Sequence, residues 1–179
     1  MYKVKFRRLQ SEILRVLCIK AGQTLNQRTL ARLLKVSPTA IGKAIVLLKK
    51  EKMIKVEKGN AINITAVTFN FDNQKALLWK KIENLKLIYE SELSNELEER
   101  FPGTTIILFG SYARGDDTST SDIDIAIIGG TEKDVSLEDF EKKLERKINL
   151  QFYQSLGEVE KNLKNNILNG IVLSGGIEL

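Results

Sequence analysis

The sequence has 179 residues, of which 42% are hydrophobic and 28% charged, and its formal net charge is +5. This composition is typical of a soluble globular protein rather than a disordered chain, and the length allows one ordinary domain or two small ones. Histidine is absent, which excludes Ser-His-Asp catalysis, Cys-His catalysis and histidine-ligated zinc. Any chemistry must therefore use carboxylates, lysines, hydroxyls or metal-bound oxygen.

The sequence predicts a cytoplasmic protein with no membrane contact. No apolar run approaches the ~20 residues that a membrane span requires. The basic amino-terminal stretch lacks the apolar core of a secretory signal. A lone Cys18 cannot form an internal disulfide, and we expect it to pack in a core.

The charge is distributed unevenly along the chain. Residues 1–70 contain 15 Lys and Arg against three acids, whereas residues 71–179 contain 13 against 20. Segments of opposite sign predict two modules with different partners, a polyanion for the first and a cation for the second.

Three helices and a hairpin are predicted in the basic segment. Apolar residues at helical spacing predict helices over 11–21, 26–36 and 38–52. Asn26 and Ser37 are the expected N-caps of the second and third, with Pro38 at the first helical position. Alternating apolar and polar residues over 53–67 around Gly59-Asn60 predict the hairpin.

This order of elements, with the stretch LARLLKVSPTAIGKAIVLLKKEKMIKVEKGN, resembles the winged helix-turn-helix domain of bacterial and archaeal transcription regulators. The resemblance implies that helix 38–52 enters the major groove of double-stranded DNA and that the protein is a homodimer. The DNA-contacting residues that it implies are Ser37, Thr39 and Lys43 on the helix and Lys55, Lys58 and Asn60 on the wing. The alternative is that the module contacts a protein and that its basic residues form a solvated face.

A boundary and a long helix follow. The stretch TFNFDNQ (68–74) loses helical periodicity and marks the boundary. Residues 74–100 predict one long amphipathic helix, on which Trp79 and Tyr89 are core or interface anchors.

Two aspartates lie in an apolar strand beyond this helix. Residues 104–110 and 121–129 predict two strands, with a turn at Gly110-Ser111 after the first. Asp122 and Asp124 then share one face of the second strand, about 7 Å apart. Two like charges are tolerated there if they are solvated on a surface strand or if a divalent cation bridges them. We expect Mg²⁺ at this pair, and a phosphate at the Gly-Ser turn.

The stretch GSYARGDDTSTSDIDIAI resembles the signature of the polymerase-beta-like nucleotidyltransferases. It is most similar to the small prokaryotic group related to the kanamycin-nucleotidyltransferase and MntA antitoxin proteins, and the similarity spans about residues 75–179. The resemblance implies transfer of a nucleoside monophosphate from a nucleoside triphosphate to a hydroxyl. It assigns phosphate binding to Gly110, Ser111 and Arg114, and Mg²⁺ binding and catalysis to Asp122 and Asp124.

The third catalytic carboxylate of this family is replaced by an amide. A helix over 136–147 and a strand over 148–154 are predicted, and this strand presents Asn149 at the catalytic position, with Gln151 next on the same face. An amide can ligate a metal but cannot accept a proton, and losing a general base costs about 10²–10⁴-fold in rate. Asp116 and Asp117 are near enough in sequence to be considered as replacements.

The expected fold is α+β, with a winged helix-turn-helix domain at residues 1–70 and a nucleotidyltransferase-type mixed β-sheet with flanking helices at residues 74–179. Three functions remain open. The protein is an active Mg²⁺-dependent nucleotidyltransferase tethered to DNA, a DNA-binding regulator that binds nucleotide without turnover, or an antitoxin-type partner of a helical RNase toxin. The missing histidine excludes that the chain is itself such a toxin.

Overall fold

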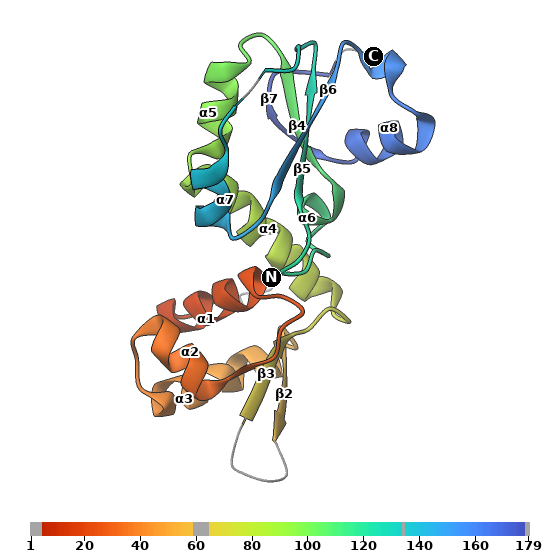
Figure 1. Ribbon diagram of the computed structural model, residues 1–179. Coiled ribbons are helices and arrows are strands. Elements are labelled where there is room, and N and C mark those ends of the chain that lie inside the picture. The colour runs from red at the N-terminus through yellow and green to blue at the C-terminus, as the bar shows by residue number, and fades with distance from the viewer. Residues whose placement is uncertain (1–4, 59–64, 134, 178–179) are drawn as a thin grey trace. The chain divides into compact units, whose positions relative to one another are not determined.

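The computed structural model describes residues 5–58, 65–133 and 135–177, and the chain forms two compact units, Met1–Lys80 and Lys81–Leu179 (Figure 1). The boundary between the units lies inside helix α4 (Gln74–Glu90). The sequence had placed the boundary earlier, at residues 70–74. Each unit is described by itself below.

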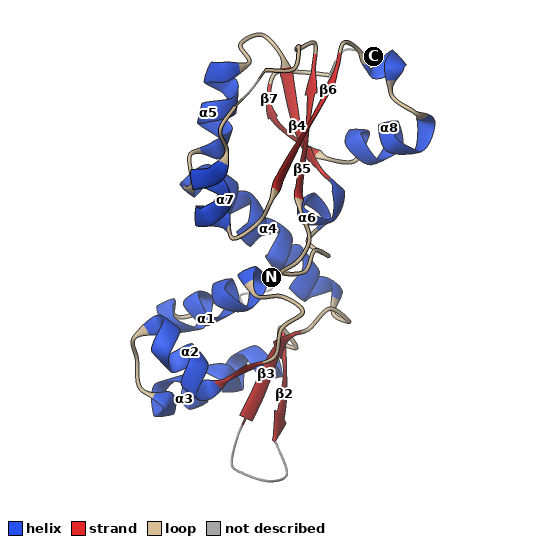
Figure 2. Cartoon of the chain, viewed as in Figure 1, coloured by secondary structure: helices blue, strands red, loops and turns tan. Residues whose placement is uncertain are grey.

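The first unit consists of three helices and a small antiparallel sheet (Figure 2). Its elements are α1 (Arg8–Ile19), β1 (Leu25–Asn26), α2 (Gln27–Leu34), α3 (Pro38–Lys50), β2 (Ile54–Lys58) and β3 (Thr65–Phe69). The strand order is β1-β3-β2, and both pairings are antiparallel. Three helices followed by a hairpin form the winged helix-turn-helix arrangement that the sequence predicted.

Side-chain caps define where the second and third helices begin. The Asn26 carboxamide oxygen accepts a hydrogen bond from the Thr29 N–H at 2.8 Å, and the Ser37 hydroxyl accepts one from the Ala40 N–H at 3.2 Å. Pro38 is the first residue of α3, so both predicted caps are confirmed. The turn at Gly59-Asn60 lies outside the described residues.

The core of the first unit is apolar and includes the lone thiol. Its fully buried residues come from the three helices, from the segment before β2, from β3 and from α4, and they include Ile13, Leu17, Cys18, Leu30, Ile41, Leu48, Met53, Val67 and Ala76. The Trp79 ring packs edge-on against Phe6, with ring centroids 5.2 Å apart. The predictions of a buried Cys18 and of an anchoring Trp79 are therefore confirmed.

The prediction of one long helix over 74–100 is wrong, because the chain forms two helices there, α4 and α5 (Leu93–Arg100). Glu92 adopts a left-handed conformation with φ of 68°, and the Ser91 hydroxyl donates to the Ile88 carbonyl. The turn allows Leu93 and Leu97 to be fully buried. No Gly or Pro marks this break, so the periodicity alone could not reveal it.

The second unit is a four-stranded mixed sheet with helices on both faces (Figure 2). The strand order is β6-β5-β4-β7; β5 and β6 are parallel, and the other pairs are antiparallel. Helices α5 and α7 lie along one face and α8 along the other. The remaining elements are β4 (Thr105–Phe109), α6 (Gly110–Arg114), β5 (Ile123–Ile128), α7 (Glu138–Leu144), β6 (Ile148–Tyr153), a 3-10 turn (Leu156–Glu158), α8 (Lys161–Leu168) and β7 (Ile171–Ser174).

Strand alternation determines which side chains face α8. Ile107 and Phe109 of β4 and Ala126 of β5 pack together with Ile167 of α8 in one buried cluster. Asp124 is two residues before Ala126, so it points to this same face at the beginning of β5.

Among the described residues, no helix is long and apolar enough to cross a membrane.

A buried polar network holds the loop that leads to β5. Asp117 forms an ion pair with Arg146 at 3.5 Å, and the two side chains are 0% and 2% exposed. The Asn84 side-chain amide of α4 donates to the Asp117 carboxylate at 2.7 Å and to the Tyr112 carbonyl at 2.9 Å. This network connects α4, the loop after α6 and the turn between α7 and β6.

Replacing Asp117 with Ala is predicted to destabilise the second unit strongly, because it leaves the Arg146 guanidinium buried without its countercharge. Removing one partner of a buried pair costs about 3–5 kcal/mol. The neighbouring Asp116 is the matched control, since its ion pair with Arg114 is half-exposed on both sides. Asp116→Ala should change the free energy of unfolding by less than about 0.5 kcal/mol. Urea denaturation of both variants measures the difference, and equal values would contradict the prediction.

Candidate functional site

The Gly-Ser turn and the aspartate strand are in direct contact. Phe109 at the end of β4 pairs with Asp124 on β5, and Gly110 follows with φ of +75°. A Cβ atom on Gly110 would lie 2.5 Å from the Oδ2 atom of Asp124, closer than real Cβ atoms approach any neighbour. This position therefore requires glycine, both for its backbone conformation and for the carboxylate beside it.

Asn149 lies beside Asp124 on the next strand. The two residues are register partners in the parallel β5–β6 pair, and the Asn149 side-chain Nδ2 donates to Asp124 Oδ1 at 3.2 Å. Asp122 is the exposed residue directly before β5, and Ser111 is half-buried in the first turn of α6. The structure thus brings Gly110, Asp124 and Asn149 together and places Asp122 at the start of the same strand.

A salt bridge lies near Asp122. Lys147 donates to the Glu141 carboxylate at 2.7 Å, and the same carboxylate accepts the Ile148 N–H at 3.0 Å. These two hydrogen bonds lower the pKa of Glu141. The hydrogen bond to Glu141 raises the pKa of Lys147, to which the nearby Asp122 carboxylate adds, so the ammonium stays charged.

A cavity opens beside these residues. It has a volume of about 560 Å³ and is lined by Asp122, by the loop residues Ser119–Ser121 and by polar residues of α7 and the turn after it, including Lys142 and Lys147. We call it the polar cavity. Of the candidate site residues, its described lining includes Asp122 but not Gly110, Ser111, Asp124 or Asn149.

The described donor set suits a hard divalent cation. It consists of two carboxylates, at Asp122 and Asp124, with an amide and a backbone turn close to Asp124. Mg²⁺ prefers oxygen ligands and is commonly held by one or two carboxylates together with substrate phosphates and water. The residues present therefore fit Mg²⁺, and Asp122 and Asp124 would hold it.

Neither loop aspartate replaces the missing third carboxylate. Asp117 is committed to the buried pair with Arg146. Asp116 pairs with Arg114, whose guanidinium also donates to Asn166 of α8 at 3.2 Å. Arg114 itself ends α6 and is exposed, and a phosphate contact would compete with these two partners.

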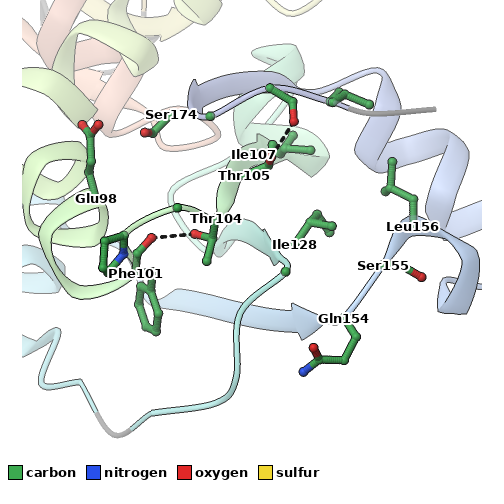
Figure 3. Close-up of a pocket in the computed structure, with 16 residues that line it drawn as sticks. Glu98, Phe101, Thr104, Thr105, Ile107, Ile128, Gln154, Ser155, Leu156 and Ser174 are labelled. Atoms are coloured by element: carbon green, nitrogen blue, oxygen red, sulfur yellow. Dashed lines mark hydrogen bonds between the residues drawn. The ribbon is translucent and has the colours of Figure 1, made fainter.

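A second, larger cavity lies at the opposite end of the strands (Figure 3). It has a volume of about 920 Å³, and its lining includes Thr104, Ile128 and Ser155. Figure 3 shows the Thr104 hydroxyl bonded to the Phe101 carbonyl. Among the described residues that line this cavity, Glu98 is the one carboxylate. The pair of acids needed for a metal site lies at the other end of the sheet.

The predicted DNA-contacting residues at α3 are exposed, but the Ser37 hydroxyl already caps the helix. Thr39 and Lys43 are exposed, and they share a helix face with Val46, which is 66% exposed, and with Lys50. The Ser37 hydroxyl oxygen accepts the capping bond, so it contributes to the helix as well as to any contact.

The wing residues are only partly described. Lys55 is exposed and pairs with Asp72 at 2.6 Å, a surface pair of small net stability that a phosphate can replace. The side chain of Lys58 and the whole of Asn60 lie outside the described residues.

Three neighbours of the site were not predicted from the sequence: Glu141, Arg146 and Lys147. They belong to LEDFEKKLERK, a stretch whose alternating charges are typical of a solvated helix. Glu141 on α7 and Lys147 in the turn after it line the same cavity as Asp122, and Arg146 in that turn pairs with Asp117. No local signal in the sequence distinguishes them from the other charges of this helix.

Gly110→Ala is predicted to disrupt the site, because the added Cβ collides with Asp124. Gly103 is the matched control: its φ is +77°, and a Cβ there would meet nothing within 4 Å. Both substitutions should cost about 1–2 kcal/mol of stability from the left-handed backbone. Only Gly110→Ala should in addition weaken divalent-cation binding, measured by Mn²⁺ titration at a temperature where both variants are folded. Equal Mn²⁺ affinities in the two variants would argue against the contact.

Comparison with known proteins identifies a domain in the second half of the chain. Residues 90–174 match the family model described as "Nucleotidyltransferase domain". The chain is also 53% identical over 45 residues to a protein of Methanocaldococcus jannaschii named "Putative protein adenylyltransferase". This similarity covers 24% of the chain and 45% of that relative, so it spans less than half of the relative's length.

Solved structures of bacterial regulators overlap with part of the chain. A single-site variant of ZitR from Lactococcus lactis matches 56% of this chain and 66% of its own, with 24% identity and a TM-score of 0.42. The adhesin competence repressor of Streptococcus pyogenes matches 54% and 69%, with 24% identity and a TM-score of 0.42. ZitR in complex with DNA matches 55% and 67%, with 25% identity and a TM-score of 0.38.

The family match contains every residue of the contact described above. Gly110, Ser111, Asp122, Asp124 and Asn149 all lie within residues 90–174. Residues 90–174 therefore form a nucleotidyltransferase domain, which follows a winged helix-turn-helix unit in the same chain.

Proposed function

We propose that this protein is a DNA-binding regulator whose second domain binds a nucleoside triphosphate with Mg²⁺ and transfers the nucleoside monophosphate to a hydroxyl. The observation that carries the proposal is the contact between Gly110 and Asp124. It joins the Gly-Ser turn after the end of β4 to the aspartates at the start of β5.

The roles of the residues follow from their positions. Gly110 and Ser111 offer backbone N–H groups and a hydroxyl to the phosphates, with Arg114 as a further cation at the end of α6. Asp122 and Asp124 would hold the Mg²⁺, which would supply positive charge to stabilise the reacting phosphoryl group. The polar cavity beside Asp122 is the proposed entry for the ligand.

The proposed reaction is a substitution at the α-phosphorus. The acceptor oxygen forms a bond to the α-phosphorus, the bond between this phosphorus and the bridging oxygen breaks, and pyrophosphate leaves. The acceptor proton passes to water, because the Asn149 amide beside Asp124 cannot accept it. A protein hydroxyl is the proposed acceptor class, supported by the name of the Methanocaldococcus jannaschii relative.

Nucleotide binding is predicted to depend on Mg²⁺ and on Asp122. Equilibrium dialysis with α,β-methylene analogues of all four ribonucleotides should detect binding of at least one in Mg²⁺ and a loss in EDTA. Asp122→Asn should weaken this binding at least tenfold, because the amide removes a charged ligand. Asp116→Asn is the control, since Asp116 pairs with Arg114 at the surface. Absence of Mg²⁺-dependent binding for all four analogues would contradict the proposal.

A second candidate function is nucleotide binding without turnover. The neutral Asn149 beside Asp124 supports it, because a general base contributes about 10²–10⁴-fold to such reactions. Transfer of label from α-³²P-labelled nucleotide to protein separates the two functions. Transfer by the wild type that Asp122→Asn abolishes supports the enzyme, and transfer that arises only in Asn149→Asp supports the binding protein.

The first unit is proposed to bind double-stranded DNA through α3 and the wing. Two observations support this proposal. Residues 1–70 contain 15 basic and three acidic residues, and Thr39 and Lys43 on α3 are exposed. Binding of this kind is mainly electrostatic.

We also propose that the protein forms a homodimer and that it is cytoplasmic. The candidate dimer contacts are Leu78, Ile82 and Tyr89 of α4, which are exposed and share one helix face.

DNA affinity is predicted to fall steeply with salt. In a fluorescence-anisotropy titration with mixed-sequence duplex DNA, Lys43→Ala should reduce the slope of log K against log salt by about 1. Lys142→Ala is the matched control, because it removes an exposed lysine from the second unit instead. The proposal fails if affinity is independent of salt or if the two variants lose affinity equally.

A further inference from the structure

We infer that Asn149 limits the Asp122–Asp124 site to a single divalent cation, where a pair of cations would need a third acidic group. This inference rests on the proposed nucleotidyltransferase function and concerns the same site. It starts from the hydrogen bond between Asn149 and Asp124.

The hydrogen bond occupies one oxygen of Asp124. The Asn149 Nδ2 group donates to Oδ1, and Oδ2 lies against Gly110. The opposite orientation of the amide would place its carbonyl oxygen against a carboxylate oxygen, so the carboxylate itself selects the donor orientation. An N–H group directed at Oδ1 keeps a cation away from that oxygen on the β6 side.

The charge of the site supports the same conclusion. Two divalent cations in one site lie about 3.5–4 Å apart, and they need several anionic ligands to offset their repulsion. Among the described residues, no cluster of three or more acidic, histidine or cysteine side chains could hold a metal. Two carboxylates thus suit one cation, which Asp122 and Asp124 would hold.

The inference limits how the acceptor can be activated. The one cation would serve the nucleotide phosphates, and no second cation would be available to the acceptor oxygen. The acceptor hydroxyl would then have no metal to lower its pKa. We therefore expect transfer by the wild type to be slower than transfer by Asn149→Asp, or absent.

Titration with Mn²⁺ alone tests the inference without any activity measurement. The electron paramagnetic resonance signal of free Mn²⁺ gives the number of ions bound per chain. The wild type should bind one ion, and Asn149→Asp should bind two, because it replaces the N–H donor with a third carboxylate. Asp122→Asn should bind none in the same concentration range.

Gln151→Glu is the matched control for the added charge. Gln151 is on the same face of β6 but pairs with Ala126 instead of Asp124, and it accepts the Tyr153 hydroxyl at 2.9 Å, which Glu can also do. This variant should bind one ion, as the wild type does. Circular dichroism establishes that each variant is folded, and Asn149→Glu serves as the second carboxylate variant if Asn149→Asp does not fold.

The outcomes separate the inference from the proposed function. Two ions in the wild type, or one ion in a folded carboxylate variant at position 149, would overturn the inference and leave the proposed function standing. No ion in the wild type, or a wild-type count that Asp122→Asn leaves unchanged, would overturn the proposed metal site and the inference with it.

Discussion

The position of the Asp124 carboxylate constrains the rest of the nucleotidyltransferase domain. One of its oxygens lies against Gly110 at the end of β4, and the other accepts a hydrogen bond from Asn149 on β6. Three segments that are far apart in sequence must therefore keep their register to within one residue. A shift of β5 by one residue would turn Asp124 to the opposite face and replace it with an isoleucine.

Buried polar contacts fix the loop between the Gly-Ser turn and the aspartates. Asp117 is buried against Arg146 and Asn84, so the middle of the loop is fixed to α4 and to the turn between α7 and β6. A buried ion pair adds little net stability, but it accepts few alternative arrangements because each charge must keep its partner. The loop therefore positions Asp122 at the start of β5 in one geometry. A metal site requires such a fixed position of its ligands.

The sequence predicted the parts of this protein that are encoded locally. The caps at Asn26 and Ser37 and the strand positions of Asp124 and Asn149 depend on residue type and spacing over a few residues. The break at Glu92 was missed because the helical periodicity continues through it, and only the burial of Leu93 reveals the turn. The buried Asp117–Arg146 pair was missed for a related reason. Both residues lie among charges that look solvated, and their burial depends on segments that meet only in the folded domain.

The edge strand β7 has a consequence for how the domain is assembled during synthesis. It pairs with β4, which also pairs with β5, although β7 is made more than 60 residues after β4. Until β7 emerges from the ribosome, β4 exposes a row of unpaired backbone groups that can pair with another nascent chain. We therefore expect the first unit to complete its fold while the ribosome is still translating the second, and the last strand to be the step that protects the domain from aggregation.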